Sequence, residues 1–175
     1  MSCNVIHTVC VQPADDERHV WVNLSGNVRH QNWELIQTID WNSFEKRIRN
    51  LILGTNDPHK SSNALNPPAV AHEPEAKRFL ILEGHVLLNH QPFRDLLDRR
   101  FFITLPEDVC RIRRSQRVYD PPDPPGYFDA FVWPMYLTNK QAMHQIYTDE
   151  EIIFLDGMMG LDQMYETILK EMLTL

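Results

Sequence analysis

Four arginines stand close together between residues 111 and 117, in the order Arg-Ile-Arg-Arg-Ser-Gln-Arg. Spacings of three and four residues let Arg113, Arg114 and Arg117 share one face of a helix. The rigid fork of N–H donors on arginine matches phosphate oxygens in a bidentate way. The turn-rich stretch that follows, residues 121–126, cannot continue a helix. This pattern favours a movable arginine lid over a transferring phosphoryl group. The alternative is a solvated basic face paired with nearby acids.

Two other places carry acids beside elements that commonly position ligands. Glu83 ends an apolar run, residues 78–83, and open parallel sheets bind ligands at the carboxyl ends of their strands. A carboxylate there can help to hold magnesium, or it can simply face solvent. In the pair Trp33-Glu34, the indole could stack on a planar ring while the acid binds ribose hydroxyls. The alternative is a core Trp beside an exposed Glu.

A phosphate-binding loop would complete such a site, and its motif is absent. The P-loop reads Gly-x-x-x-x-Gly-Lys-[Ser/Thr], in which backbone N–H groups cradle phosphates and the Lys reaches the β and γ oxygens. The chain has 6 glycines, and none is followed by lysine. We therefore expect no P-loop within this sequence.

The elements that must position these residues alternate between strands and helices. Strands are predicted over 78–83, 101–105 and 151–155, and helices over 41–53 with Asp40 as N-cap, from Pro106 through the arginines, and from about Leu161. A further short helix is predicted from the leucines and Phe93 between residues 87 and 97. This alternation predicts an α/β fold with a mainly parallel sheet and flanking helices. Residues up to about 35 show no strong βαβ pattern, and residues 55–77 read as an excursion loop.

Composition and charge exclude some functions. A net charge of −7 and a pI of about 5.6 argue against nucleic-acid binding. No apolar run approaches the length needed to span a bilayer. The 3 cysteines, Cys3, Cys10 and Cys110, show no paired spacing, so we expect free thiols, and no signal peptide is evident. The expected localisation is cytoplasmic.

Residues 113–129, Arg-Arg-Ser-Gln-Arg-Val-Tyr-Asp-Pro-Pro-Asp-Pro-Pro-Gly-Tyr-Phe-Asp, followed by Val-Trp-Pro-Met-Tyr at 132–136, resemble the lid segment of nicotinamide riboside kinases. This family belongs to the uridine-kinase-like P-loop phosphotransferases. The segments at 32–34, 81–84, 102–106 and 155–157 are similar to the family in order and spacing. The resemblance divides the chain into a divergent segment, residues 1–13, and a nucleoside-kinase-like domain, residues 14–175, with a lid region at about 111–131.

The resemblance also implies roles for individual residues. ATP would be bound by Arg113, Arg117, Val118 and Tyr119, the nucleoside by Trp33, Glu34, Arg114 and Asp120, and magnesium would be supported by Glu83. Where Glu34 and Asp120 stand, family members more often carry Asp and an amide. The family's catalytic Asp should fall just before residue 10, where no acid stands, so we expect no catalytic base in the chain.

The implied fold is a P-loop-kinase-like parallel sheet with flanking helices that lacks the first βαβ unit, an N-terminal truncation. The implied reaction of the complete enzyme is ATP-dependent, Mg²⁺-dependent phosphorylation of nicotinamide riboside to nicotinamide mononucleotide in NAD biosynthesis. We expect this chain alone to be impaired or inactive. Two alternatives stay open: a non-catalytic nucleoside-binding or regulatory form, and a relative of uridine or cytidine kinases.

Overall fold

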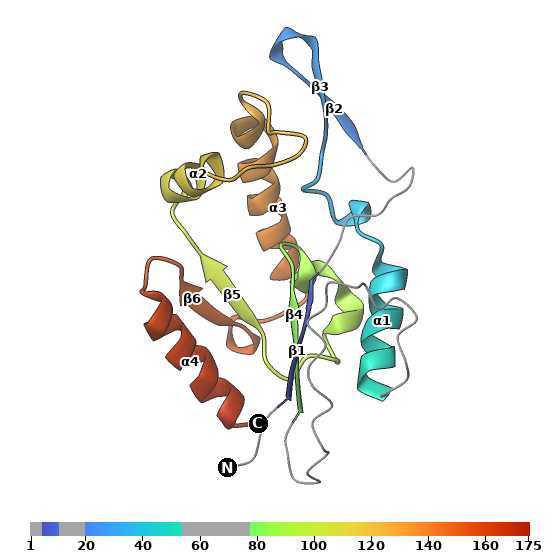
Figure 1. Ribbon diagram of the computed structural model, residues 1–175, viewed down its shortest axis with the longest axis vertical. Coiled ribbons are helices and arrows are strands. Elements are labelled where there is room, and N and C mark those ends of the chain that lie inside the picture. The colour runs from blue at the N-terminus through green and yellow to red at the C-terminus, as the bar shows by residue number, and fades with distance from the viewer. Residues whose placement is uncertain (1–4, 11–19, 54–77) are drawn as a thin grey trace. The chain divides into compact units, whose positions relative to one another are not determined.

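The computed structural model describes residues 5–10, 20–53 and 78–175 (Figure 1). The predicted loop at 55–77, Cys3 and most of the divergent segment lie outside these ranges. The helices and strands are β1 (Val5–Cys10), β2 (Trp21–Leu24), β3 (Val28–Gln31), α1 (Trp41–Leu53), β4 (Arg78–Glu83), β5 (Phe101–Thr104), α2 (Glu107–Ser115), α3 (Trp133–Met143), β6 (Ile153–Asp156) and α4 (Leu161–Leu173). They form two compact units, one with β1, α1 and β4, the other with the remaining elements.

The first unit contains a parallel strand pair and one amphipathic helix. β1 and β4 run side by side from the pair Val5 and Arg78 to the pair Cys10 and Glu83 (Figure 1). Strand β1 was not predicted, although its β-branched residues suit a strand. Helix α1 matches its predicted range, and the Ser43 N–H donates to Asp40 Oδ1 at 3.2 Å, which confirms the N-cap.

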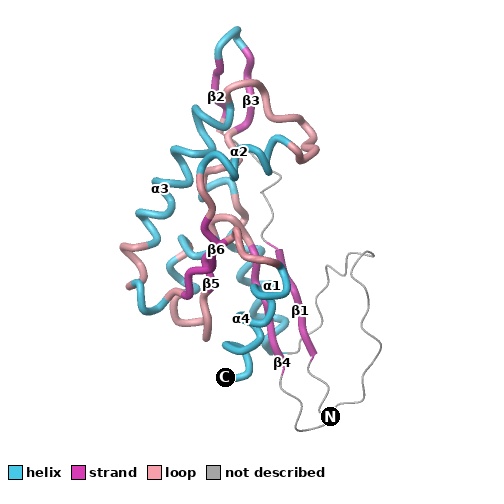
Figure 2. Tube along the Cα trace, turned by 90° about the vertical axis from the view of Figure 1, so that its left-hand side faces the viewer, coloured by secondary structure: helices cyan, strands magenta, loops and turns pink. Residues whose placement is uncertain are grey.

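The second unit contains a hairpin that the sequence pattern did not reveal. β2 and β3 pair antiparallel, with Trp21 opposite Gln31, and Figure 2 shows them joined by a short helical turn. In that turn Gly26 has a φ of 80° and Asn27 a φ of 60°. Glycine and asparagine are the residues that tolerate this left-handed conformation, so the turn reverses the chain at low cost.

The second unit also contains the parallel pair β5–β6 and its own core. Phe101 pairs with Ile153, and the register continues to Thr104 and Asp156. The core consists of Leu88, Met143, Tyr147 and Ile152, packed against Leu97, Phe102 and Ile146. These residues come from the segment before β5, from β5, from the end of α3 and from the segment before β6, so the core joins α3 to the strand pair.

Two details differ from the sequence expectations. The predicted short helix between 87 and 97 is wrong: two 3₁₀ turns, Leu87–Asn89 and Gln91–Phe93, stand there. Pro92 explains this, because proline lacks the N–H that would continue a helix from the preceding turn. Pro106 is the N-cap of α2 rather than its first residue.

The sheet is also smaller than expected. Within the described ranges the strands form three two-stranded sheets, two of them parallel, instead of one continuous parallel sheet. The α/β class and the parallel pairing agree with the prediction, and the absence of a first βαβ unit stays a prediction. No helix in the described part of the chain is long and apolar enough to cross a membrane.

Candidate functional site

Helix α2 carries the arginine cluster and ends inside it. The Cys110 N–H donates to Pro106 O at 2.9 Å in the first turn, where Glu107 and Asp108 also stand. Arg113 and Arg114 occupy the last turn. Negative charges at the start of the helix and positive charges at its end both interact favourably with the helix dipole. Arg117 lies just beyond the helix and its N–H donates to Arg114 O at 3.0 Å. The helix therefore presents two of the three predicted arginines, and the following turn presents the third.

Arg114 is held by two carboxylates in a half-buried cluster. Its Nε donates to Asp123 Oδ2 at 2.6 Å, and its Nη2 lies 3.0 Å from Glu34 Oε1. The side chains of Arg114, Glu34 and Asp123 are only 20%, 13% and 23% exposed. Burial works to lower the pKa of Arg114, but the hydrogen bond to Asp123 and the charge of Glu34 raise it above the ordinary arginine value. Arg114 thus stays a cation between two anions.

The other arginines divide into two kinds. Arg111 pairs with Glu107 and Asp129 at the surface, as a solvated basic face would. Arg113 instead donates to Gly157 O at 3.1 Å, and Arg117 donates to the Tyr119 hydroxyl at 3.4 Å. Within residues 5–10, 20–53 and 78–175, neither Arg113 nor Arg117 pairs with a carboxylate. Their charges remain available to an anion, so the structure separates arginines that the sequence pattern could not.

The segment after β3 is held in place by Tyr127 and by α3. The Trp33 N–H donates to the Tyr127 hydroxyl at 3.2 Å, and the Glu34 N–H donates to Asn32 Oδ1 at 3.1 Å. Asn139 of α3 donates to Glu34 O at 3.1 Å. The alternative of an exposed Glu34 is therefore wrong, because both its backbone and its carboxylate are engaged.

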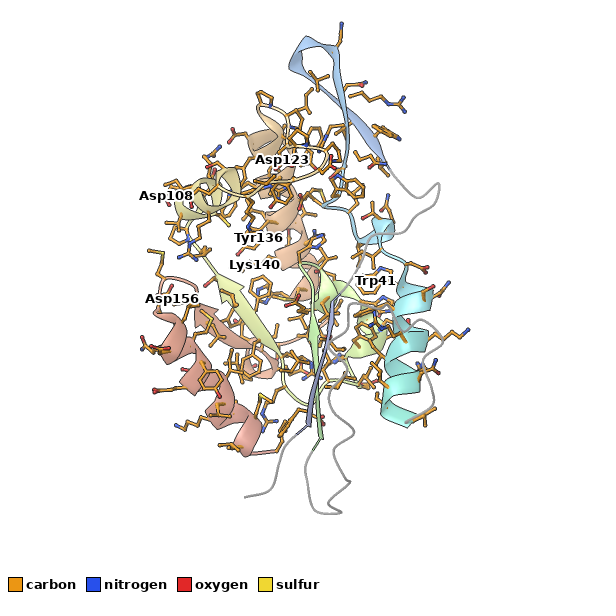
Figure 3. The ribbon with its side chains drawn as sticks, in the orientation of Figure 1. Trp41, Asp108, Asp123, Tyr136, Lys140 and Asp156 are labelled. Atoms are coloured by element: carbon orange, nitrogen blue, oxygen red, sulfur yellow. The ribbon has the colours of Figure 1, made fainter. Side chains whose placement is uncertain are left out.

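Sequence reasoning missed three residues of this cluster: His30, Asp123 and Tyr127. Tyr127 is fully buried, and the His30 ring packs edge-on against it with centroids 4.6 Å apart. His30 Nε2 lies 4.0 Å from Asp123 Oδ1 (Figure 3 labels Asp123 in the loop between α2 and α3). The only signal in the sequence was the motif Asp-Pro-Pro-Gly-Tyr at 123–127. In the structure this motif contacts residues about 90 positions earlier in the chain, such as Trp33.

A cavity of about 470 Å³ lies between the end of α2 and the loop after it. Its lining residues are Arg111, Arg114, Ser115, Arg117, Val118, Tyr119, Pro122, Asp123, Pro124, Gly126 and Phe128. Four of the residues predicted to bind ATP or nucleoside therefore line one cavity. The other four predicted residues, Trp33, Glu34, Arg113 and Asp120, are not part of this lining, and Asp120 is exposed.

Val118 and Tyr119 differ in their surroundings. Val118 is 98% exposed, so no described residue covers it. The guanidinium of Arg114 lies over the Tyr119 ring, 5.1 Å from its centroid. Tyr119 thus presents an aromatic face beside the acidic cluster, a geometry suited to a cation or a planar ring.

Glu83, the predicted metal residue, ends strand β4 in the first unit and is exposed. The described residues contain no group of three or more His, Cys, Asp or Glu side chains that could hold a metal ion. Magnesium usually keeps several waters and binds through one or two carboxylates together with substrate phosphates. One carboxylate at a strand end fits a magnesium ion of that kind and does not fit a site made of protein ligands alone.

Comparison with known proteins gives the family. The chain is 43% identical over 109 residues to nicotinamide riboside kinase 1 of Rattus norvegicus, across 60% of this chain and 55% of that protein. It is 33% identical over 172 residues to nicotinamide riboside kinase 2 of Homo sapiens, across 97% of this chain and 69% of that protein. The chain belongs to the nicotinamide riboside kinase family. This confirms the family that the lid motif indicated.

Two further findings set the scope of that membership. The chain spans about half the length of the rat relative. A shorter match, 44% identical over 43 residues and covering 25% of this chain, is the uridine kinase of Haemophilus ducreyi. No family model matches the chain.

Proposed function

We propose that this chain carries the nucleoside-binding and lid parts of a nicotinamide riboside kinase. In the complete protein, the γ-phosphoryl group of ATP passes to the 5′-hydroxyl of nicotinamide riboside, which gives nicotinamide mononucleotide for NAD biosynthesis. The observation that carries the proposal is the cluster of Arg114, Glu34 and Asp123 beside two arginines, Arg113 and Arg117, that pair with no described carboxylate. Such a division supplies separate places for a nucleoside and for phosphate.

On the nucleoside side, Trp33 stacks on the nicotinamide ring and Glu34 accepts hydrogen bonds from the ribose hydroxyls. Arg114 faces Glu34, with its Nη2 3.0 Å from Glu34 Oε1, so the carboxylate is held in place as an acceptor. Asp120 lies nearby in sequence and contacts the nucleoside when the lid closes. A carboxylate with hydrogen-bond partners in place before the ligand arrives loses little entropy on binding.

On the phosphate side, Arg113 and Arg117 contact ATP, and Val118 and Tyr119 lie against the nucleotide. Arginines at the transferring phosphoryl group compensate charge that develops in the transition state. Glu83 supports a magnesium ion bound to ATP. That ion, when bound, neutralises part of the phosphate charge.

The proposed reaction also needs a phosphate cradle and a base, and this sequence contains no Gly-Lys pair. We propose that a strand, P-loop and helix in addition to residues 1–175 supply them. Two-stranded sheets are marginal when alone, and the pairs β1–β4 and β5–β6 are both of that size, which supports a further strand. The lack of a P-loop motif equally favours the second candidate, a nucleoside-binding protein without catalytic activity.

The test combines binding with turnover. The purified 175-residue chain is titrated with nicotinamide riboside and, separately, with uridine by calorimetry. Transfer of labelled phosphate from ATP is then measured with magnesium present. We expect saturable binding that favours nicotinamide riboside over uridine, and no transfer until a P-loop unit is added. Transfer by the chain alone would overturn the requirement for that unit, and absence of nucleoside binding would overturn the proposed function.

A further inference from the structure

Two residues of the loop between α2 and α3 reach the segment that is proposed to bind the nucleoside. Asp123 holds the Arg114 guanidinium through Nε at 2.6 Å and Nη2 at 3.3 Å. Tyr127 accepts a hydrogen bond from the Trp33 N–H at 3.2 Å. Neither residue was singled out by its type or spacing in the sequence. Both connect the lid to Trp33 and Glu34 while no nucleoside is bound.

The Asp123 contact determines where the guanidinium of Arg114 points. A carboxylate that takes Nε and one terminal nitrogen fixes the plane of the guanidinium group. The remaining N–H donor of Nη2 then faces Glu34, 3.0 Å away. An arginine without this second acid could rotate about its flexible stem and leave Glu34 with a mobile partner. Asp123 therefore acts on Glu34 through Arg114.

The Tyr127 contact determines where the backbone of Trp33 lies. The hydroxyl accepts from Trp33 and lies 3.3 Å from Gln31 O, to which it can donate. Burial, followed by the negative charge of Glu34, raises the pKa of Tyr127 to about 12. The hydroxyl therefore keeps its proton at physiological pH and serves as donor and acceptor at once. The His30 ring, packed edge-on at 4.6 Å, closes the other side of the tyrosine.

We propose that Asp123 and Tyr127 are positioning residues that arrange the nucleoside site from the lid. Asp123 sets the carboxylate of Glu34 for the two ribose hydroxyls, and Tyr127 sets the backbone that carries the Trp33 ring. This inference rests on the proposed function and adds that the lid prepares the nucleoside site before the phosphate donor arrives. Arg114 lies on the same helix turn as Arg113, so nucleoside binding at Arg114 also restricts the motion of Arg113, which is proposed to contact ATP.

The experiment compares two ligands that differ only at the ribose. Nicotinamide riboside and its 2′-deoxy analogue are titrated by calorimetry into the full chain, into Asp123→Asn and into Tyr127→Phe. With Asp123→Asn we expect about tenfold weaker binding of nicotinamide riboside, the effect of losing about one charge-assisted hydrogen bond, and less than about twofold for the deoxy analogue. With Tyr127→Phe we expect both ligands to weaken by similar factors, because that hydroxyl acts on the ring-bearing backbone.

Matched controls remove the same groups elsewhere in the second unit. Asp129→Asn removes a lid carboxylate that pairs with Arg111 rather than Arg114. Tyr147→Phe removes the hydroxyl of another tyrosine, 2% exposed, in the core around Met143. Both controls should bind the two ligands as the unchanged chain does. Asp123→Glu, which keeps the charge, should recover part of the ribose-dependent affinity.

Several outcomes would overturn the inference. If Asp123→Asn weakens the binding of both ligands equally, the residue only supports the fold. If it leaves both affinities unchanged, the residue does not position Glu34. If the unchanged chain binds no nicotinamide riboside, the proposed function fails instead. Hydrogen exchange at the Trp33 amide, measured without ligand, still decides the positioning claim, because Tyr127→Phe should raise that exchange rate and an unaltered rate would refute it.

Discussion

At the scale of single residues, partners decide what identical side chains can do. Every arginine is a permanent cation with the same fork of donors, so residue type alone does not separate Arg111, Arg114 and Arg117. Arg111 is paired at the surface, Arg114 is paired in a half-buried cluster, and the guanidinium of Arg117 donates to the Tyr119 hydroxyl. The difference lies in which carboxylates the fold brings within reach.

The first residue-scale prediction compares two paired arginines. Arg114→Ala leaves Glu34 and Asp123 as uncompensated, half-buried anions, so the free energy of unfolding should fall by about 1–3 kcal/mol. Arg111→Ala should change it much less than Arg114→Ala does, because the side chains of Arg111 and Glu107 are 41% and 45% exposed and solvent screens their attraction. Urea denaturation of both variants tests this, and equal losses would contradict it.

The second residue-scale prediction concerns alkaline pH. Burial raises the pKa of Tyr127 from its ordinary value near 10 to about 12. The unfolded chain releases this proton first, so stability is complete below about pH 10 and falls as the pH rises toward 12. In Tyr127→Phe, the decline of the melting temperature between pH 9 and 11.5 should be shallower than in the unchanged chain. An equal decline in both proteins would show that other groups cause it.

At the scale of elements, the residue after strand β6 contacts the last turn of helix α2. Gly157 follows β6, its N–H donates to Thr104 O at 2.8 Å, and its carbonyl accepts from Arg113. A Cβ built at Gly157 would lie 2.8 Å from the Leu105 side chain and 2.9 Å from Thr104 O. The backbone can approach β5 this closely only because residue 157 has no side chain. The same approach places an acceptor for Arg113.

The element-scale prediction follows from that close contact. Gly157→Ala should lower the free energy of unfolding by about 1–3 kcal/mol, because the added methyl group overpacks against a backbone oxygen. Gly160→Ala is the control: nothing lies within 4 Å of its Cβ, and as the N-cap of α4 it should lose less than about 1 kcal/mol. Thermal melts of both variants decide, and a larger loss at position 160 would count against this account.

At the scale of the whole molecule, apolar surface stands open in the second unit. Leu161, Tyr165 and Leu173 of α4 are 83%, 65% and 62% exposed, and Ile103 of β5 is 52% exposed. No residue of α4 is buried, so its apolar side chains are not covered as a core face would be. Large apolar side chains exposed along one helix mark a surface that favours association.

The molecule-scale prediction tests that surface. The double variant Leu161→Gln/Leu173→Gln should reduce hydrophobic-dye fluorescence and light scattering at high concentration, with little change in melting temperature, because these side chains contribute little burial. Glu166→Gln, an exposed polar change on the same helix, should leave dye binding as it was. An unchanged dye signal in the double variant would show that the surface lies elsewhere.

The local elements were largely determined by the sequence. Helix α1, strand β4 and the helix through the arginines follow from apolar spacing, an N-cap and proline punctuation, which act between neighbouring residues. The pattern missed β1, the hairpin β2–β3 and α3. Short strands give weak periodic signals, and Pro134 in the first turn of α3 resembles a helix breaker although that position accepts it.

The cluster of Arg114, Glu34 and Asp123 was determined by the tertiary structure alone. Glu34 and Arg114 stand 80 positions apart, and Trp33 and Tyr127 stand 94 apart. Local patterns act over a few residues, whereas these contacts exist because β3, α2 and the loop after it pack in one unit. The sequence by itself determined that the four arginines, the proline-rich turn after them and the pair Trp33-Glu34 are present. Only the packing decided which arginine meets which acid, since ion pairing depends on distance and burial rather than on order along the chain.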